Sequence, residues 1–327
     1  MQQQKILSVG PLPEWVRDEF FSPFEVNAVK DSSRSAVLSS LDVRVVAIIS
    51  RGPVLIDAQV MDAAPSLKAI ARTGVGLDTV DVEAASLRNI PVLYTPGVMS
   101  RAVAEHTLAL ILAAAKDLFG WHQRVLQEKW QQRYQVDNLD LEGATLGIIG
   151  LGRIGRQVWK LARALDVHIL VTDPYLDPSH FPEDELRFVK LEELLEQSDI
   201  VTLHTPLNNE TRGLINSRNI SRFKPGAILI NTARGAVIES YDILFSALES
   251  LQLRRVAMDT LIVEPPDLSH PFFHHRNVIL TAHVAARTQR AQEAILRTMG
   301  HDLAATLRGT PPPRENLANP EAFLENH

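Results

Sequence analysis

Short apolar runs alternate with stretches of helical pattern along most of the chain. In its first part, five apolar runs predict strands: Lys5–Val9, Glu25–Ala28, Val43–Ile49, Leu67–Ala71 and Pro91–Tyr94. Apolar residues at helical spacing predict helices between these runs, including Ala58–Ala64 and Val82–Arg88. Strands that alternate with helices are typical of parallel sheets covered by helices on both faces, so we expect an α/β fold.

A second series of strands follows one Ala- and Leu-rich helix, which we expect over Ala102–Lys116. Six runs make up this series: Thr145–Ile149, His168–Thr172, Ile200–His204, Ala227–Asn231, Val256–Met258 and Val278–Leu280. Six parallel strands suit a fold built from two mononucleotide-binding halves. The pattern therefore predicts two doubly wound domains.

The last helical pattern carries an apolar residue at every fourth position, at Ala291, Ile295, Met299, Leu303 and Leu307. Such a face needs a partner surface, and we expect it to dock on the first domain. Three prolines at 311–313 cannot continue a helix, so we expect an extended tail after it. The predicted domains are residues 1–100 with 289–327, and residues 101–288.

Composition and charge narrow the functional classes. Hydrophobic residues make up 45% of the chain and charged residues 22%, as in ordinary globular proteins, and the net charge is −6. We therefore expect no nucleic-acid partner and no anionic membrane partner. The chain has no cysteine, which excludes disulfides and cysteine nucleophiles. It shows no signal-peptide pattern and no apolar run of spanning length, so we expect a cytoplasmic protein without a membrane span.

A glycine motif follows the predicted strand Thr145–Ile149. Gly150, Gly152 and Gly155 form a GxGxxG pattern that opens a helical stretch. In dinucleotide-binding folds, such glycines allow a tight turn, a close approach of the pyrophosphate, and packing of helix on strand. The alternative is a plain glycine-rich turn. Asp173 ends the next strand, about 20 residues on, where a carboxylate binds the ribose hydroxyls, so we expect NAD rather than NADP.

Polar residues follow the carboxyl ends of the later strands, and these ends share one edge of a parallel sheet. The residues are Thr205, Thr232, Arg234, Asp259, Glu264 and His283. Their position at one edge predicts a ligand or active site there.

Each of these residues also has a structural interpretation. His283 is either a hydrogen-bonded core histidine or a general acid/base, because imidazole titrates near neutral pH. Glu264 is either an ordinary loop carboxylate or the partner of that imidazole. Arg234 is either a solvated turn residue or a clamp for a substrate carboxylate. Three further histidines, His270, His274 and His275, lack a metal-ligand pattern, and we expect no metal site.

Seven segments together resemble the D-isomer-specific 2-hydroxyacid dehydrogenases, a family that includes phosphoglycerate dehydrogenase and the glyoxylate/hydroxypyruvate reductases. They are RTGVGLD (72–78), VAEHT (103–107), LGIIGLGRIG (146–155), TPL (205–207), NTARG (231–235), EP (264–265) and TAH (281–283). The resemblance implies a flavodoxin-like substrate domain and a Rossmann NAD-binding domain with a cleft between them. It also implies a homodimer formed through the NAD-binding domains.

The same resemblance implies roles for individual residues. Arg234, Glu264 and His283 match the catalytic trio: His283 exchanges a proton with the 2-oxo oxygen during hydride transfer, Glu264 keeps the imidazole protonated, and Arg234 polarises the carbonyl and holds the carboxylate. Backbone N–H groups of Val75 and Gly76 would bind the substrate carboxylate. The implied NAD-binding residues are Gly150, Gly152, Arg153, Ile154, Gly155, Asp173, Thr205, Thr232, Asp259 and, more weakly, Thr107.

The substrate is less defined than the reaction. Arg51 and Arg72 either bind the phosphate of a phosphorylated hydroxy acid or only shape their loops, and the first reading favours a phosphoglycerate-dehydrogenase-like enzyme. The alternative is a glyoxylate/hydroxypyruvate reductase. Formate and phosphite dehydrogenases do not fit, because they carry Gln at position 264 and Lys at position 75. We expect no carboxy-terminal regulatory domain. A different class with the same fold is an NAD(H)-sensing corepressor-like protein.

Overall fold

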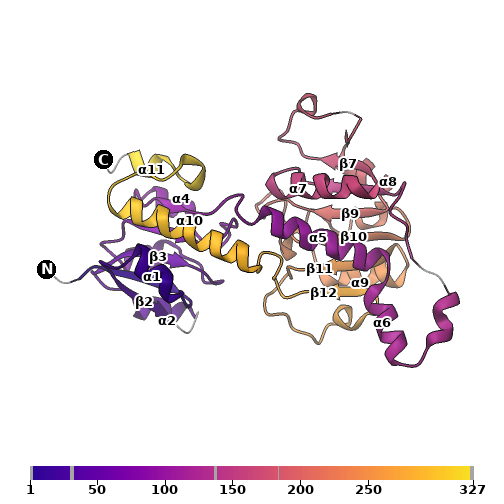
Figure 1. Cartoon of the computed structure of the whole chain (residues 1–327), viewed down its shortest axis with the longest axis horizontal. Helices are drawn as coiled ribbons and strands as arrows, with labels where there is room; N and C mark the ends of the chain where they lie inside the picture. Colours follow the sequence, from indigo (N-terminus) through magenta and orange to yellow (C-terminus); the bar gives the residue numbers. More distant parts are fainter. Residues whose placement is uncertain (1–2, 30–32, 136–137, 183, 325–327) are drawn as a thin grey trace. The chain divides into compact units, whose positions relative to one another are not determined.

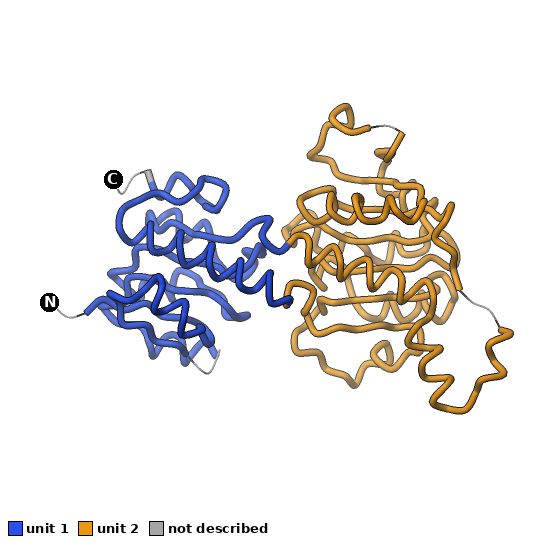
Figure 2. The backbone as a smooth tube through the Cα atoms, in the orientation of Figure 1, with its two compact units in different colours: residues 1–99, 288–327 blue, residues 100–287 orange. Residues whose placement is uncertain are grey.

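The computed structural model describes residues 3–29, 33–135, 138–182 and 184–324. They form two compact units, which comprise residues 1–99 with 288–327 (unit 1) and residues 100–287 (unit 2), as Figure 2 shows. Unit 1 is therefore built from two segments that flank unit 2 in the sequence.

Unit 1 contains a five-stranded parallel sheet in the order β2-β1-β3-β4-β5. The strands are β1 (Lys5–Val9), β2 (Glu25–Val29), β3 (Val45–Ser50), β4 (Ala69–Arg72) and β5 (Val92–Leu93). One face packs against α2 (Arg34–Ser39), α3 (Ala58–Asp62) and α4 (Val82–Ser86), and the other against α1 (Glu14–Phe20) and α10 (Gln289–Leu307). This order is that of flavodoxin-like folds, in which the strand order reverses between β1 and β3 while all strands stay parallel.

Helix α10 packs on this sheet through the apolar face that its sequence pattern predicts. Ile295, Met299 and Leu303 are buried, and the helix contacts α1 and β4. Gly300 lies so close to α1 that a Cβ atom there would come within 2.4 Å of the Phe20 ring. The small residue thus allows the two helices to approach each other.

The prediction of an extended tail is wrong for residues 314–324. This segment forms η7 (Arg314–Asn316) and α11 (Glu321–Leu324), and Leu317 makes an antiparallel bridge with Leu93 of β5. The side chain of Asn319, which is 1% exposed, accepts a hydrogen bond from the backbone N–H of Val92 at 2.7 Å. Leu317 and Phe323 are buried, so the segment covers the edge of the sheet.

Unit 2 contains a seven-stranded parallel sheet in the order β12-β11-β10-β9-β6-β7-β8. The strands are β6 (Thr145–Ile149), β7 (His168–Thr172), β8 (Arg187–Phe188), β9 (Ile200–Leu203), β10 (Ala227–Asn231), β11 (Leu253–Met258) and β12 (Val278–Leu280). The sequence predicted six strands, and this number is wrong because it missed β8. This edge strand has only two residues, which is too short to produce an apolar run. The first six strands have the order of a Rossmann fold, which places the reversal between β6 and β9.

Helices cover both faces of this sheet (Figure 1). One core cluster joins it to α5 (Ser100–Ala115) and α7 (Arg153–Ala162), and another joins it to α8 (Leu191–Gln197) and α9 (Tyr241–Glu249). Among the described residues, we find no helix with the length and apolar character of a membrane span.

Helix α6 (Leu118–Leu126) and the turn η1 (Trp130–Tyr134) extend away from these layers (Figure 1). Neither element buries any residue. The start of this projecting segment is held by Arg255 of β11, whose side chain is 2% exposed. Arg255 donates to the Ala114 carbonyl at 3.0 Å and lies 3.3 Å from the Asp117 carboxylate. Arg124 of α6 binds the same carboxylate at 2.7 Å. The segment therefore projects from a fixed base.

Candidate active site and cofactor site

The glycine motif forms a tight turn between β6 and α7. Gly150 has a φ of +90°, and a Cβ atom there would lie 2.9 Å from the His204 carbonyl oxygen. A Cβ atom on Gly155 would lie 2.2 Å from the Gly150 carbonyl oxygen. A Cβ atom on Gly152 would meet nothing within 4 Å, so this turn has an open side next to the amino terminus of α7. Such a turn suits a pyrophosphate.

Asp173, directly after β7, faces the glycine turn. Its Oδ2 atom accepts a hydrogen bond from the Leu151 N–H at 2.9 Å, and its Oδ1 atom accepts one from the Tyr175 N–H at 3.1 Å. The carboxylate thus lies beside the turn, at the place where Rossmann folds bind the ribose hydroxyls of NAD.

Two buried polar atoms at the end of β9 have no hydrogen-bond partner among the described residues. They are Nδ1 of His204 and Oγ1 of Thr205. Burial lowers the pKa of His204 to about 3, so its ring stays neutral near pH 7. Buried polar atoms normally have partners, and both residues lie beside Gly150, where a Cβ atom would meet the His204 carbonyl and the Thr205 methyl group. The sequence indicated Thr205 but treated His204 as a strand residue.

His283 and Glu264 form the pair that their positions suggested. His283 Nδ1 lies 2.8 Å from Glu264 Oε2, and the Leu261 N–H donates to Glu264 Oε1 at 2.8 Å. Because an ionised carboxylate can only accept hydrogen bonds, His283 Nδ1 carries a hydrogen. Nε2 is the ring nitrogen that does not contact Glu264. Burial alone would raise the pKa of Glu264, but the His283 and Leu261 hydrogen bonds and the charges of His283 and Arg234 hold it below its ordinary value.

Arg234 enters the same group from the end of β10. Its backbone turn is fixed by Asn231, whose Nδ2 donates to the Arg234 carbonyl at 2.9 Å. The next residue, Gly235, lies against the loop that carries Glu264: a Cβ atom there would overlap the Leu261 backbone at 2.0 Å. The structure therefore brings Arg234, Glu264 and His283 together from three neighbouring strand ends. A cation, a carboxylate and an imidazole in this arrangement can bind an anionic substrate and move a proton.

Comparison with known proteins agrees with this geometry. Residues 108–285 match the family model described as "D-isomer specific 2-hydroxyacid dehydrogenase, NAD binding domain". The chain belongs to the D-isomer specific 2-hydroxyacid dehydrogenase family. Unit 2 therefore contains the NAD-binding domain of a 2-hydroxyacid dehydrogenase.

Individual relatives are named for different reactions. A glyoxylate reductase of Thermofilum pendens is 38% identical over 82% of this chain and 79% of its own length. A D-3-phosphoglycerate dehydrogenase of Archaeoglobus fulgidus is 33% identical over 94% of this chain, but the chain spans only 58% of that relative. The structure of Aquifex aeolicus D-lactate dehydrogenase with NAD and lactic acid matches 97% of this chain and 99% of its own, with a TM-score of 0.86 and 25% identity.

Three residues that were predicted to bind NAD have buried polar side chains. Asp259 is 1% exposed, and its carboxylate accepts hydrogen bonds from Thr281 Oγ1, from the Val284 N–H and from the Ala285 N–H. Thr107 and Thr232 are also buried, and their hydroxyl oxygens lie 2.8 Å apart. In this structure their polar atoms bind other parts of the protein, and their contact with NAD stays a prediction.

The predicted substrate residues of unit 1 lie at the carboxyl ends of β3 and β4. Arg72 donates to the carbonyl oxygens of Gly76 at 3.2 Å, Gly52 at 3.0 Å and Ser50 at 3.3 Å. Arg51 donates to the Pro11 carbonyl oxygen. Arg72 thus joins the loop after β3 to the loop that contains Val75 and Gly76. The structure supports the loop-shaping interpretation of Arg72.

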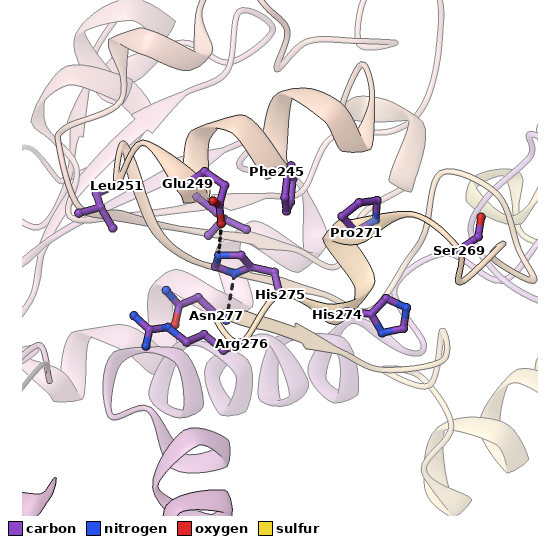
Figure 3. Close-up of a pocket in the computed structure, with 10 residues that line it drawn as sticks. Phe245, Glu249, Leu251, Ser269, Pro271, His274, His275, Arg276 and Asn277 are labelled. Atoms are coloured by element: carbon purple, nitrogen blue, oxygen red, sulfur yellow. Dashed lines mark hydrogen bonds and ion pairs between the residues drawn. The ribbon is translucent and has the colours of Figure 1, made fainter.

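Of the three loop histidines, His270 lies beside the start of α9, 3.1 Å from Asp242, whereas His274 and His275 lie near the amino ends of β11 and β12. A hollow of about 760 Å³ is lined there by His274, His275 and Arg276, near the amino ends of β11 and β12. Figure 3 shows the His275 ring between Glu249, at 3.3 Å, and the backbone of Asn277. Among the described residues, no group of three or more His, Asp or Glu side chains could hold a metal ion.

Proposed function

We propose that this protein catalyses the reversible, NAD-dependent interconversion of a small D-2-hydroxyacid and its 2-oxoacid. The observation that carries the proposal is the 2.8 Å contact between His283 Nδ1 and Glu264 Oε2, with Arg234 at the neighbouring strand end. The names of the relatives support the same reaction class.

Each member of this trio has a separate task. When bound, NAD supplies or accepts the hydride. His283 Nε2 donates a proton to the 2-oxo oxygen in reduction and removes it from the hydroxyl group in oxidation. Glu264 stabilises the imidazolium and fixes the ring, because its carboxylate accepts from Nδ1. The Arg234 guanidinium binds the substrate carboxylate and polarises the neighbouring carbonyl.

Within this class, a phosphorylated three-carbon acid is our first candidate, as in D-3-phosphoglycerate dehydrogenases. Two arginines at adjacent strand ends support this candidate. Ser50, the residue before Arg51, pairs with Arg72 across β3 and β4, so Arg51 and Arg72 lie at the carboxyl ends of neighbouring strands. The three carbonyl contacts of Arg72 weigh against a direct role for that residue, so we assign the phosphate to Arg51, whose guanidinium also donates to the Pro11 carbonyl oxygen. Backbone N–H groups of Val75 and Gly76 would bind the carboxylate. The glyoxylate reductase relative supports an unphosphorylated acid instead.

One assay separates these candidates. The initial rate of NADH oxidation is measured with glyoxylate, hydroxypyruvate, 3-phosphohydroxypyruvate and a bulky 2-oxoacid, and then repeated with NADPH. A preference for 3-phosphohydroxypyruvate that is lost in Arg51→Gln supports the phosphorylated substrate. Faster reduction of glyoxylate or hydroxypyruvate supports the reductase. NADH binding without turnover of any acid contradicts the proposed reaction and favours an NAD(H)-sensing protein.

We also propose a homodimer in which a second copy covers the projecting segment. Large apolar side chains of this segment are 52–71% exposed, namely Leu118, Phe119, Val125, Leu126, Trp130 and Tyr134. An exposed apolar patch of this kind is typical of a protein–protein interaction surface. Sedimentation equilibrium should give the mass of two chains for the wild type, and Leu126→Asp with Trp130→Ser should weaken association. A wild-type monomer at micromolar concentration would exclude this assembly.

A further inference from the structure

Helix α5 contacts two loops of the proposed active site through two adjacent residues. His106 Nε2 lies 3.0 Å from Thr281 Oγ1, in the loop that carries His283. Thr107 Oγ1 lies 2.8 Å from Thr232 Oγ1, in the loop that carries Arg234. Both belong to the VAEHT segment, and neither side chain has a part in the proton transfer proposed above.

The directions of the hydrogen bonds near His106 follow from the Asp259 carboxylate, which can only accept. Thr281 Oγ1 donates its single hydrogen to Asp259 Oδ1 at 2.5 Å. Its oxygen must therefore accept from His106, so His106 Nε2 carries a hydrogen. The same nitrogen lies 3.4 Å from Asp259 Oδ1. A chain of hydrogen bonds thus runs from His106 through Thr281 to the buried Asp259 carboxylate.

Asp259 in turn fixes the backbone around His283. Its side chain accepts from the N–H groups of Val284 and Ala285 at 2.9 and 3.0 Å, and its carbonyl oxygen accepts from the His283 N–H at 2.7 Å. His283 has a φ of +53°, a left-handed conformation that costs energy for a residue with a Cβ atom. The hydrogen bonds to Asp259 hold this conformation, and with it the direction in which the imidazole leaves the chain.

The second branch reaches the loop of Arg234. Thr107 donates its hydrogen to the Val103 carbonyl oxygen at 2.8 Å, so Thr232 is the donor in the contact between the two hydroxyl groups. Thr107 is 0% exposed and Thr232 is 6% exposed, so water does not replace this contact. Arg234 follows Thr232 by two residues.

We propose that His106 and Thr107 are positioning residues that set the His283 loop and the Arg234 loop against one helix. Neither residue takes part in proton transfer. Because the two loops come from different strands, a shared anchor on α5 fixes the distance between the acid/base and the substrate clamp. This inference rests on the proposed function for its catalytic consequence, but the anchoring itself is independent of the substrate.

Paired substitutions test the role of each side chain. His106→Phe keeps a ring but removes the donor, whereas His106→Gln places an amide N–H near the position of Nε2. Thr107→Val and Thr107→Ser form the matching pair for the hydroxyl group. We expect kcat to fall about tenfold in the Phe and Val variants, with KM within twofold of the wild type. For His106→Phe the NADH dissociation constant should also stay within twofold. The Gln and Ser variants should recover kcat to within about threefold.

Glu105→Gln is the control on the same helix, because Glu105 is exposed and forms an ion pair with Arg101, one turn earlier on the helix. Its kcat should equal that of the wild type. Equal activity of His106→Phe and the wild type, or equal loss in His106→Phe and His106→Gln, would overturn the proposal for His106. The same comparison of the Val and Ser variants decides the role of Thr107.

A double-mutant cycle separates anchoring from general destabilisation. His106→Phe and Thr281→Val remove the same hydrogen bond, so the double variant should be no more than about twofold slower than Thr281→Val alone. Independent, multiplying losses would contradict a shared hydrogen bond.

Amide hydrogen exchange gives a second result that does not depend on turnover. Peptides that cover residues 281–287 should exchange faster in His106→Phe than in the wild type, and His106→Gln should restore their protection. If the wild type turns over no 2-oxoacid but exchange behaves as stated, the proposed function fails and the anchoring stands. Unchanged exchange in His106→Phe would refute the anchoring whatever the activity.

Discussion

Replacement of Asp259 by Asn tests the hub of the buried network with the smallest change of shape. The carboxylate receives three hydrogen bonds: Oδ1 accepts from Thr281 and from the Val284 N–H, and Oδ2 accepts from the Ala285 N–H. An amide offers one acceptor atom and one donor atom. In its better orientation, Asn keeps the two bonds to Oδ1 and places its NH2 group against the Ala285 N–H.

The cost follows from this geometry. At least one bond to a charged acceptor is lost, and two donors face each other where the side chain is 1% exposed. A hydrogen bond to a charged group contributes about 1.5 to 3 kcal/mol, so we expect a loss of about 2 to 3 kcal/mol of unfolding free energy. For a unit of this size, that corresponds to a decrease in Tm of about 4 to 12 °C. Since His283 loses support for its left-handed conformation, kcat should fall about tenfold to a hundredfold.

Thermal unfolding followed by circular dichroism, and steady-state kinetics well below Tm, measure the two effects. Asp242→Asn is the control: its carboxylate is 86% exposed and lies 3.1 Å from His270, so the Tm should change by less than about 1 °C. If Asp259→Asn unfolds within 2 °C of the wild type and keeps its kcat, the hydrogen bonds described for Asp259 do not hold the loop.

Three further substitutions address the chemistry. His283→Ala should lower kcat at least about a hundredfold while NADH binding, measured by fluorescence, stays within twofold; retained turnover would exclude its acid/base role. Asp173→Ala should reduce the preference for NADH over NADPH about tenfold in kcat/KM, and an unchanged ratio would show that another group selects the cofactor. The lowered pKa of Glu264 keeps its carboxylate ionised above its ordinary value of 4.5, so its support of protonated His283 is lost only as pH falls through the lowered value. In Glu264→Gln this support is absent at every pH, so the decline of 2-oxoacid reduction that protonation of Glu264 causes in the wild type at acid pH should be missing; a variant that keeps this decline would contradict the ion pair.

Most of the fold could be predicted because buried parallel strands are continuous apolar runs. Thr145–Ile149 and Ala227–Asn231 stand in the structure with the predicted bounds. The strand Arg187–Phe188 could not be found, since two residues at a sheet edge carry no periodicity. The segment after the three prolines was also beyond sequence reasoning, because its order comes from pairing with β5 rather than from its own pattern.

The sequence could predict which residues lie at the same edge of the sheet, but it could not predict which atoms they contact. That Arg234, Glu264 and His283 share one edge followed from parallel strands alone. A carboxylate after a strand, however, can face a ligand or an adjacent loop, and only the structure shows that Asp259 faces Val284 and Ala285. The orphan Nδ1 of His204 likewise depends on which atoms surround the ring.

The division of unit 1 into two segments has a consequence for synthesis in the cell. Residues 100–287 leave the ribosome before α10, so unit 2 can fold while one face of the unit 1 sheet still lacks one of its two covering helices. Until Leu296, Met299 and Leu303 arrive, the apolar residues of this face, such as Ile49 and Ala71, are covered by the α1 segment alone. Nascent chains therefore pass through a stage in which unit 2 is folded and unit 1 still exposes apolar residues of its sheet. During this stage the exposed residues can bind chaperones or lead to aggregation.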